Sequence, residues 1–208
     1  MSTHSEKVAS RKRIRIAIFA SGSGSNALAL IRRFSVENDF ASVVVLVTNK
    51  PACGAVQHAK DCGVKVFLIT RENFISSDET INYLKDLQID WIVLAGFLWK
   101  VPPALVKSFE GRIINLHPSL LPKFGGKGMY GRHVHEAVLQ AKESITGITV
   151  HFVNERYDDG NIIFQASVPL SETDGVNDIE QKVRALESHY FCDVVERLIV
   201  ESKIGMLE

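Results

Sequence analysis

The sequence has little cysteine and no excess of charge of either sign. Among its 208 residues are three cysteines, and Lys plus Arg total 24, as do Asp plus Glu. The thiols at Cys53, Cys62 and Cys192 are too few and too scattered for a disulfide framework. Because the charge is balanced, we expect no nucleic-acid partner. Any bound phosphate must then be held locally, by backbone amides or a few placed side chains.

Long apolar runs are also missing. No uninterrupted apolar segment approaches the ~20 residues that a membrane-spanning helix needs. The first dozen residues are polar and mildly basic, without the apolar centre of a signal peptide. We therefore expect a flexible tail over residues 1–12, one domain over residues 13–208, and a cytoplasmic protein without a membrane partner.

A metal site is a possible interpretation of Cys53, His58 and Cys62, which lie close together in the chain. They fall in a stretch rich in Ala, Gly and Val, with no fourth ligand nearby. Structural zinc sites have four ligands, whereas half-buried thiols on a helix are common. We therefore expect no metal.

Apolar segments alternate in type along the first 116 residues. Continuous or alternating apolar runs predict strands, and apolar residues at helical spacing predict the helices between them. The predicted strands are 13–20, 41–48, 65–69, 91–94 and 113–116, and the predicted helices are 26–34, 53–62 and 76–87. A capping box of Ser76 and Glu79 begins the last of these helices. This alternation predicts a parallel sheet built from right-handed crossover units.

The remaining chain predicts a helix at 133–141, strands at 145–153 and 162–169, and a closing helix at 176–201. Residues 154–161 are too few for a crossover helix, so the last two strands should pair antiparallel. We therefore predict an α/β, Rossmann-like open twisted sheet. It is mostly parallel, with an antiparallel C-terminal strand pair and helices on both faces.

A glycine-rich turn follows the first predicted strand and precedes a helix. Glycines bring backbone amides close to a ligand, and amides at a helix N-terminus attract anions. A dinucleotide fingerprint would also need an acidic residue ~20 positions later, where this chain has Thr48-Asn49-Lys50. A nicotinamide cofactor is therefore disfavoured. A tight turn without a ligand is the alternative, but two hydroxyls beside the glycines favour phosphate. The turn residues are Gly22, Ser23, Gly24, Ser25 and Asn26.

The most informative stretch is the predicted strand end at Asn115 and His117. The two residues are two positions apart, so their side chains leave the same face of an extended backbone. Ligands of open α/β sheets bind at this end of the strands. Pro118 and Pro122 end the strand and stiffen the segment after it. Together these features favour a site with an amide donor and an imidazole.

A second informative segment is the acidic turn Asp158-Asp159-Gly160, which comes after the predicted strand at 145–153. Considered locally, it is an ordinary turn made of turn-forming residues. The turn comes after the strand end that carries Asn115 and His117, and this combination makes Asp158 a candidate site residue. Ser119 lacks an activating base nearby and is not a candidate nucleophile.

The other histidines have structural interpretations. His151 lies in the middle of a predicted strand and is expected to be packed or partly exposed rather than catalytic. His133 and His135 lie at the start of a predicted helix and are expected at the surface.

Four segments occur in the order found in the folate-dependent formyltransferases: Gly22 to Asn26, Leu94 to Phe97, Asn115 to Pro122, and Gly147 to Gly160. The chain resembles this family over roughly residues 13–200, in particular the branch that formylates phosphoribosylglycinamide. The resemblance implies transfer of the formyl group of 10-formyltetrahydrofolate to the amine of phosphoribosylglycinamide, in de novo purine (IMP) biosynthesis. The implied transfer is direct, through a tetrahedral intermediate. The alternatives are another formyl-tetrahydrofolate-dependent transferase or a hydrolase on the same fold, a nucleotide-binding oxidoreductase, and a non-catalytic binding module.

The resemblance also implies roles for individual residues. Asn115, His117 and Asp158 form the catalytic set, and Asp158 is expected to orient the His117 ring and raise its pKa. Gly22 to Asn26 hold the substrate phosphate, and Glu187 contacts phosphoribosylglycinamide. No metal takes part. The folate-binding residues implied are Leu98, Trp99, Lys100, Val101, Asn115, Asn154, Glu155, Arg156, Tyr157 and Asp158.

Two further points distinguish the chain. The segment from Lys123 to Arg132 is longer and richer in glycine than in many relatives, so its conformation is left open. No arginine occurs around Ser76 to Asp78, where some relatives contact the folate tail. Composition is equally compatible with a monomer and a homodimer.

Overall fold

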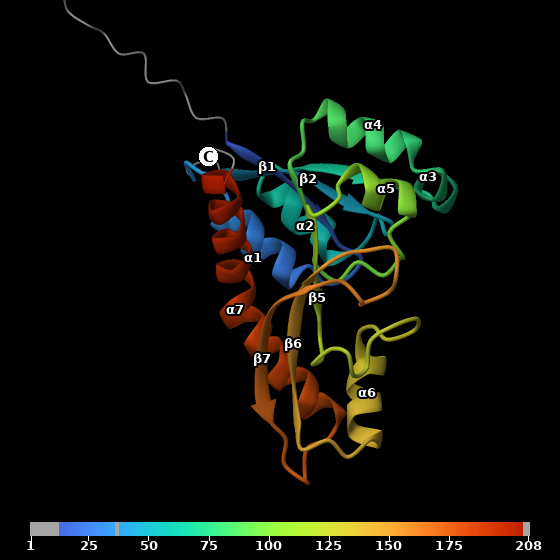
Figure 1. Cartoon of the computed structure of the whole chain (residues 1–208), viewed down its shortest axis with the longest axis vertical. Helices are drawn as coiled ribbons and strands as arrows, with labels where there is room; N and C mark the ends of the chain where they lie inside the picture. Colours follow the sequence, from blue (N-terminus) through green and yellow to red (C-terminus); the bar gives the residue numbers. More distant parts are fainter. Residues whose placement is uncertain (1–12, 36–37, 206–208) are drawn as a thin grey trace, which may run out of the picture.

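In the computed structural model, which describes residues 13–35 and 38–205, seven strands form one sheet in the order β3-β2-β1-β4-β5-β6-β7 (Figure 1). β6 runs antiparallel to both β5 and β7, and the other pairs are parallel. The predicted mixed sheet is therefore confirmed. The strands are β1 (Ile14–Phe19), β2 (Ala41–Thr48), β3 (Lys65–Leu68), β4 (Trp91–Leu94), β5 (Ile113–His117), β6 (Ile145–Phe152) and β7 (Ile162–Pro169).

Helices cover both faces of the sheet, as predicted. One apolar cluster contains inward-facing residues of α1, α2, α6 and α7, and a second contains those of α3, α4 and α5. α7 is the long helix along one side of Figure 1. The helices are α1 (Ser25–Arg33), α2 (Gly54–Asp61), α3 (Arg71–Ser76), α4 (Asp78–Asp86), α5 (Pro103–Ser108), α6 (Arg132–Gln140) and α7 (Val176–Gly205).

The continuous apolar runs of the central strands result from burial on both faces. In β2, Val45 and Val47 belong to one apolar cluster, while Leu46 between them belongs to the other. Ile18 and Phe19 of β1 likewise belong to different apolar clusters. Successive side chains of a strand point to opposite faces, so a strand covered by helices on both sides needs apolar residues at every position.

The segment from residue 70 to residue 86 differs from the prediction. It forms two short helices, and Ser76 is the last residue of α3 rather than the cap of α4. The Ser76 hydroxyl donates to the carbonyl of Asn73 at 3.2 Å. Glu79 accepts a hydrogen bond from the Asn73 side chain. The predicted capping box is therefore wrong, because a left-handed residue, Ser77 (φ 65°), separates the helices.

Two helices, α3 and α5, are absent from the prediction. Each has six residues, which is too short for a helical apolar period to be recognised. Local chemistry nevertheless explains their starts. The Thr70 hydroxyl accepts the Asn73 N–H at 3.3 Å, and Pro103 occupies the first turn of α5, where no backbone donor is needed.

The order of the strands places a crevice at one edge of the sheet. After β1 the chain continues to β2 and β3 on one side, then returns to β4 on the other side of β1. Connections that leave neighbouring strands in opposite directions open a crevice at the carboxyl ends of those strands. The glycine turn after β1 and the segment after β4 therefore border the same opening.

Candidate active site

A cavity of about 390 Å³ lies at the carboxyl ends of β1, β4 and β5. All but one of the site residues expected from the sequence line it; the exception is Glu155, which is exposed and does not contribute to the lining. The sequence-predicted residues that line the cavity are Gly22, Ser23, Gly24, Ser25, Asn26, Leu98, Trp99, Lys100, Val101, Asn115, His117, Asn154, Arg156, Tyr157, Asp158 and Glu187.

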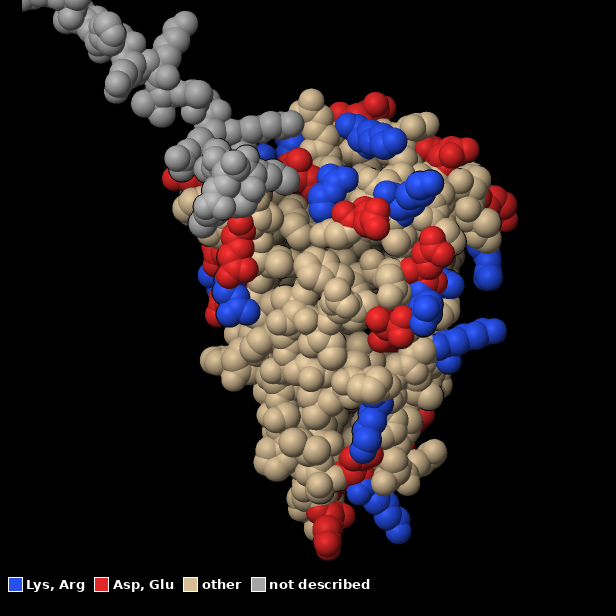
Figure 2. All heavy atoms as spheres, viewed as in Figure 1, with Lys and Arg blue, Asp and Glu red and all other residues tan. Residues whose placement is uncertain are grey.

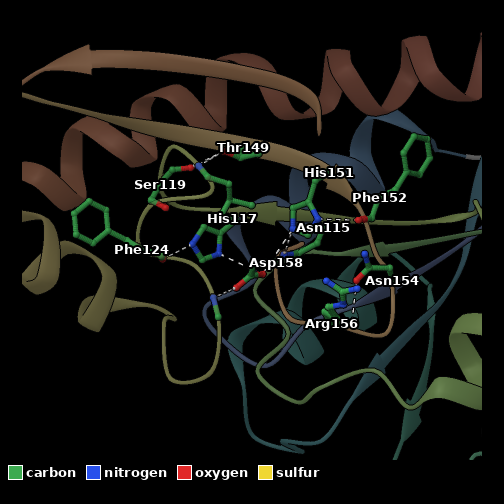
Figure 3. A network of polar contacts seen from close by, with 12 residues as sticks. Asn115, His117, Ser119, Phe124, Thr149, His151, Phe152, Asn154, Arg156 and Asp158 are labelled. Atoms are coloured by element: carbon green, nitrogen blue, oxygen red, sulfur yellow. Dashed lines mark hydrogen bonds and ion pairs between the residues drawn. The ribbon is translucent and has the colours of Figure 1, made fainter. Parts of the chain in front are cut away.

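His117 ends β5, and each of its ring nitrogens has a polar neighbour. Its Nε2–H donates to the carbonyl oxygen of Phe124 at 2.8 Å, since a carbonyl can only accept (Figure 3). Its Nδ1 lies 3.6 Å from Asp158 Oδ1. Because Nε2 is committed to the backbone, Nδ1, on the side of the carboxylate, is the nitrogen that can gain or lose a proton.

Burial decides the pKa of His117. The residue is 3% exposed, and loss of solvent lowers its pKa, although Asp158 and the Phe124 carbonyl both act to raise it. The net direction is the opposite of the sequence expectation. The carboxylate acts in the expected direction, but the cost of burying an imidazolium is larger. His117 therefore favours the neutral ring.

Asp158 is reached by the glycine-rich segment that comes after β5. Its Oδ2 accepts the N–H of Gly126 at 2.9 Å, and its own φ of 50° is left-handed, in keeping with the tolerance of Asp for this conformation. A Cβ on Gly125 would lie 2.5 Å from Leu121 Cδ2 and 3.2 Å from Asp158 Cβ. The segment whose conformation the sequence left open thus contacts both His117 and Asp158.

Asn115 faces a histidine that the sequence pattern placed outside the site. The register of β5 and β6 sets Asn115 opposite His151, and Asn115 Nδ2 lies 3.1 Å from His151 Nε2. His151 is 1% exposed, so its expected packing is confirmed. Its Nε2 is also 3.7 Å from Asp158 Oδ1. The strand pairing is the signal that could have revealed this contact, because opposed residues of antiparallel strands interact.

The glycine turn meets the last helix across the cavity. Gly24 has φ 83° and precedes α1, and a Cβ there would lie 2.5 Å from the Ala55 backbone. Asn26 donates to Glu187 Oε2 at 2.9 Å, although the two are 161 residues apart. Burial raises the pKa of Glu187, partly offset by this bond from Asn26. Turn and helix thus place backbone amides, hydroxyls and one carboxyl around the same space.

His135 corrects a second expectation. His133 is exposed, as expected, but His135 is 4% exposed and lines the cavity. It is buried because α6 packs against α7, which turns one helix face inward. Its Nδ1 has no hydrogen-bond partner among the described residues. Glu180 and Arg184 of α7, joined at 2.6 Å, also line the cavity and were not predicted.

Trp99, which the family resemblance assigns to folate binding, has contacts on two sides. It lines the cavity and also packs on the aromatic cluster of Phe74 and Phe97, with ring centroids 5.8 and 6.4 Å away. Beside it, the Lys100 ammonium lies 5.3 Å from the centre of the Tyr157 ring, which joins the segment after β4 to the turn after β6. A folate role for these residues stays a prediction.

Comparison with known proteins assigns the family. The family model described as formyl transferase matches residues 14–195. The chain belongs to the formyl transferase family. Among the described residues, no group of three or more His, Cys, Asp or Glu side chains is arranged to hold a metal ion.

Relatives within the formyl transferase family carry related names. The chain is 34% identical to the phosphoribosylglycinamide formyltransferase of Bacillus subtilis, over 89% of this chain and 94% of that protein. It is 38% identical, over 91% of its length, to the chloroplastic phosphoribosylglycinamide formyltransferase of Vigna unguiculata, and spans 62% of that relative. It spans 14% of the trifunctional purine biosynthetic protein adenosine-3 of Drosophila melanogaster.

Solved structures of this formyl transferase fold agree with the architecture. The phosphoribosylglycinamide formyltransferase of Bacillus halodurans aligns with a TM-score of 0.80 at 35% identity, covering 90% of this chain and 96% of that one. That of Anaplasma phagocytophilum aligns with a TM-score of 0.83 at 29% identity, covering 91% and 88%.

Proposed function

We propose that this chain transfers the formyl group of 10-formyltetrahydrofolate to the amine of phosphoribosylglycinamide, giving the N-formyl product and tetrahydrofolate in de novo purine biosynthesis. One observation carries the proposal: Asn115 and His117 of β5 and the sequence-distant Asp158 line one cavity. The names of relatives that align over nearly all of the chain support it. The finer assignment of acceptor and co-substrate rests on that similarity and on the polar groups around the cavity.

The two ends of the cavity suit the two substrates. The amides and hydroxyls of Gly22 to Asn26, at the N-terminus of α1, favour a phosphate, and Glu187 beside them can accept hydrogen bonds from ribose hydroxyls. Residues 98–101, 154 and 156–158 provide the mixed apolar and polar lining that a folate ring needs. No nicotinamide is proposed, because the ribose-binding acid expected after β2 is replaced by Thr48-Asn49-Lys50. No metal is proposed either, because direct transfer of the formyl group needs none.

The proposed reaction begins with attack of the amine on the formyl carbon. The carbonyl oxygen becomes an oxyanion in a tetrahedral intermediate, and Asn115 Nδ2–H donates to it. Loss of one such donor typically costs about 3–4 kcal/mol in the barrier. No covalent bond to the protein is needed, because amine and formyl donor react directly.

His117 transfers the proton from the amine to the folate in this scheme. Burial keeps its ring neutral near pH 7, so Nδ1 can accept the proton that the attacking amine loses. The imidazolium formed is stabilised by the Asp158 carboxylate, 3.6 Å away, and by the Phe124 carbonyl. It then donates the proton to the folate nitrogen, and the tetrahedral intermediate collapses to products.

The test mixes the purified protein with 10-formyltetrahydrofolate, with and without phosphoribosylglycinamide, and follows loss of the formyl-folate. Loss that depends on the acceptor is the expected result. Loss without the acceptor would instead identify a formyl-folate hydrolase. Loss that requires a different amine would identify another transferase, and binding without turnover would identify a non-catalytic module.

Location and assembly belong to the same proposal. In the described part of the chain, no helix is both long enough and apolar enough to cross a bilayer. Figure 2 shows positive and negative side chains interspersed around α3 and α4, and few charges over β6 and β7. Three free thiols favour a cytoplasmic enzyme of small molecules, and the balanced surface charge is compatible with a monomer or a homodimer. Cell fractionation and sedimentation of the purified chain test both points.

A further inference from the structure

We propose that His151 is a positioning residue for the reaction. As a neutral imidazole with its proton on Nδ1, it fixes the Asn115 amide so that the Nδ2 donor faces the Asp158 carboxylate and the His117 ring. The role in catalysis rests on the proposed function. The pairing of the two side chains does not, because it is a property of the resting protein.

The tautomer of His151 is set by its backbone contact. His151 Nδ1 lies 2.8 Å from the carbonyl oxygen of Phe152, the next residue (Figure 3). A carbonyl oxygen only accepts, so Nδ1 carries a proton in every protonation state that keeps this bond. In the neutral ring Nε2 then carries no proton, and its lone pair needs a hydrogen-bond donor.

Asn115 supplies that donor. Its Nδ2 is 3.1 Å from His151 Nε2, and the lone pair accepts one of the two amide hydrogens. The two ends of an Asn amide are nearly equal in shape, so its orientation is set by its hydrogen-bond partners. An Nε2–H would reverse this choice and draw Oδ1 of Asn115 to the same place. An acceptor would then stand beside Asp158, where the proposed reaction develops a negative oxygen.

The surroundings of His151 keep this arrangement in place. Its ring is 1% exposed, so water cannot easily replace it as the acceptor for Asn115. The titratable groups that face it are Asp158, at 3.7 Å from Nε2, and His117. Burial lowers the pKa of His151, and the His117 charge lowers it further, against the raising effects of the Phe152 carbonyl and Asp158. The neutral ring is therefore the state consistent with the contacts.

Two substitutions separate positioning from packing. His151→Gln keeps a neutral acceptor, because a Gln oxygen can occupy the place of Nε2, whereas His151→Leu fills similar volume without one. We expect kcat for formyl transfer to fall about 10²–10³-fold in His151→Leu, the range for loss of an oxyanion donor, with KM for both substrates little changed. In His151→Gln the loss should be less than about tenfold, since an amide oxygen accepts the same bond.

The tautomer is measured without turnover, by long-range ¹H–¹⁵N NMR of the wild-type protein, and the Gln variant identifies the His151 signals by their loss. We expect a protonated Nδ1 and a bare Nε2 at His151, with slowly exchanging side-chain amide hydrogens at Asn115. A proton on Nε2 would overturn the proposal, as would a folded Leu variant with wild-type kcat. Equal losses in the Gln and Leu variants would also overturn it. A wild-type protein with this tautomer but no formyl transfer would instead contradict the proposed function and leave the pairing intact.

Discussion

At the scale of single residues, one carboxylate lies close to two imidazoles that have different proposed roles. Asp158 Oδ1 lies 3.6 Å from His117 Nδ1 and 3.7 Å from His151 Nε2. Both rings are buried, and a charge on His117 lowers the pKa of His151. A second imidazolium in the same space is therefore disfavoured. With His151 neutral and bound to Asn115, His117 is the ring left to exchange a proton.

The first prediction concerns this set of residues. His117→Asn and Asp158→Asn should each reduce kcat about 10²–10⁴-fold, the usual contribution of a positioned acid or base. Asp159→Asn is the matched control, because Asp159 lies on the same turn, is half exposed and pairs with Arg156 at 3.4 Å. Steady-state kinetics with circular dichroism test this. Near-normal turnover in either of the first two variants removes that residue from the catalytic set.

At the scale of elements, Thr149 of β6 ties the segment after β5 to the sheet. Its hydroxyl donates to the Ser119 carbonyl at 2.6 Å, and accepts the Leu121 N–H at 3.0 Å and the Gln165 amide at 2.9 Å. Thr149 has no exposed surface. These three bonds hold the chain that leads from His117 into the glycine-rich segment.

The second prediction tests this tie. Thr149→Val removes the hydroxyl and leaves buried groups without partners, so the free energy of unfolding should fall by about 1–3 kcal/mol. Thr149→Ser retains the hydroxyl and should lose less, since only a methyl group is deleted. Urea denaturation of both variants provides the comparison. If Thr149→Val were as stable as the wild type while Thr149→Ser lost stability, packing of the methyl group, rather than the hydrogen bonds, would stabilise the segment.

The third prediction concerns the turn between β1 and α1. Gly24→Ala forces a left-handed Ala and a contact with Ala55, so we expect unfolding to become easier by at least about 1–2 kcal/mol. Gly22→Ala is the control, because a Cβ there meets nothing within 4 Å. The denaturation midpoints of the two variants, compared with that of the wild type, test this expectation. If Gly24→Ala were as stable as Gly22→Ala, the close approach of α1 and α2 would not require this glycine.

At the scale of the whole molecule, stability should depend on pH through buried histidines. His117, His135 and His151 all have pKa values lowered by burial. The unfolded chain then binds more protons than the folded one as the pH falls past about 6.5, the ordinary histidine value. The folded state therefore loses stability below that pH, until each folded pKa is passed. The raised pKa of Glu187 acts in the opposite sense, destabilising the fold as the pH rises above its ordinary value of 4.5.

The fourth prediction isolates one of these histidines. His135→Gln should flatten the dependence of unfolding free energy on pH below 6.5 by up to about 1.4 kcal/mol per pH unit, the value for one proton. His133→Gln, at an exposed position of the same helix, is the matched control. Denaturation curves between pH 5 and 7 measure both. An unchanged slope in His135→Gln would show that His135 titrates alike in the folded and unfolded chain.

Local patterns predicted most of the architecture, for identifiable reasons. The β-branched run of β2 and the mixed run of β1 are long enough to identify strands covered on both faces, and residues 154–161 are too short for a crossover. The short helices α3 and α5 were not predicted. Ser76 and Glu79 match a capping-box pattern, but the chain does not form that capping box. A motif of four residues cannot reveal that a left-handed Ser77 interrupts it, because Ser77 is fully buried and its burial depends on packing that the motif does not describe.

By itself, the sequence determined the alternation of strands and helices in the first half of the chain, the glycine turn, and the placement of Asn115 and His117 at a strand end, because these depend on residue spacing. Tertiary structure decided that His135 is buried, that His117 has a lowered rather than raised pKa, and that His151 meets Asn115. Each of these depends on contacts between segments distant in the chain, where solvent exclusion and strand register set the energy of a charge and the direction of a hydrogen bond.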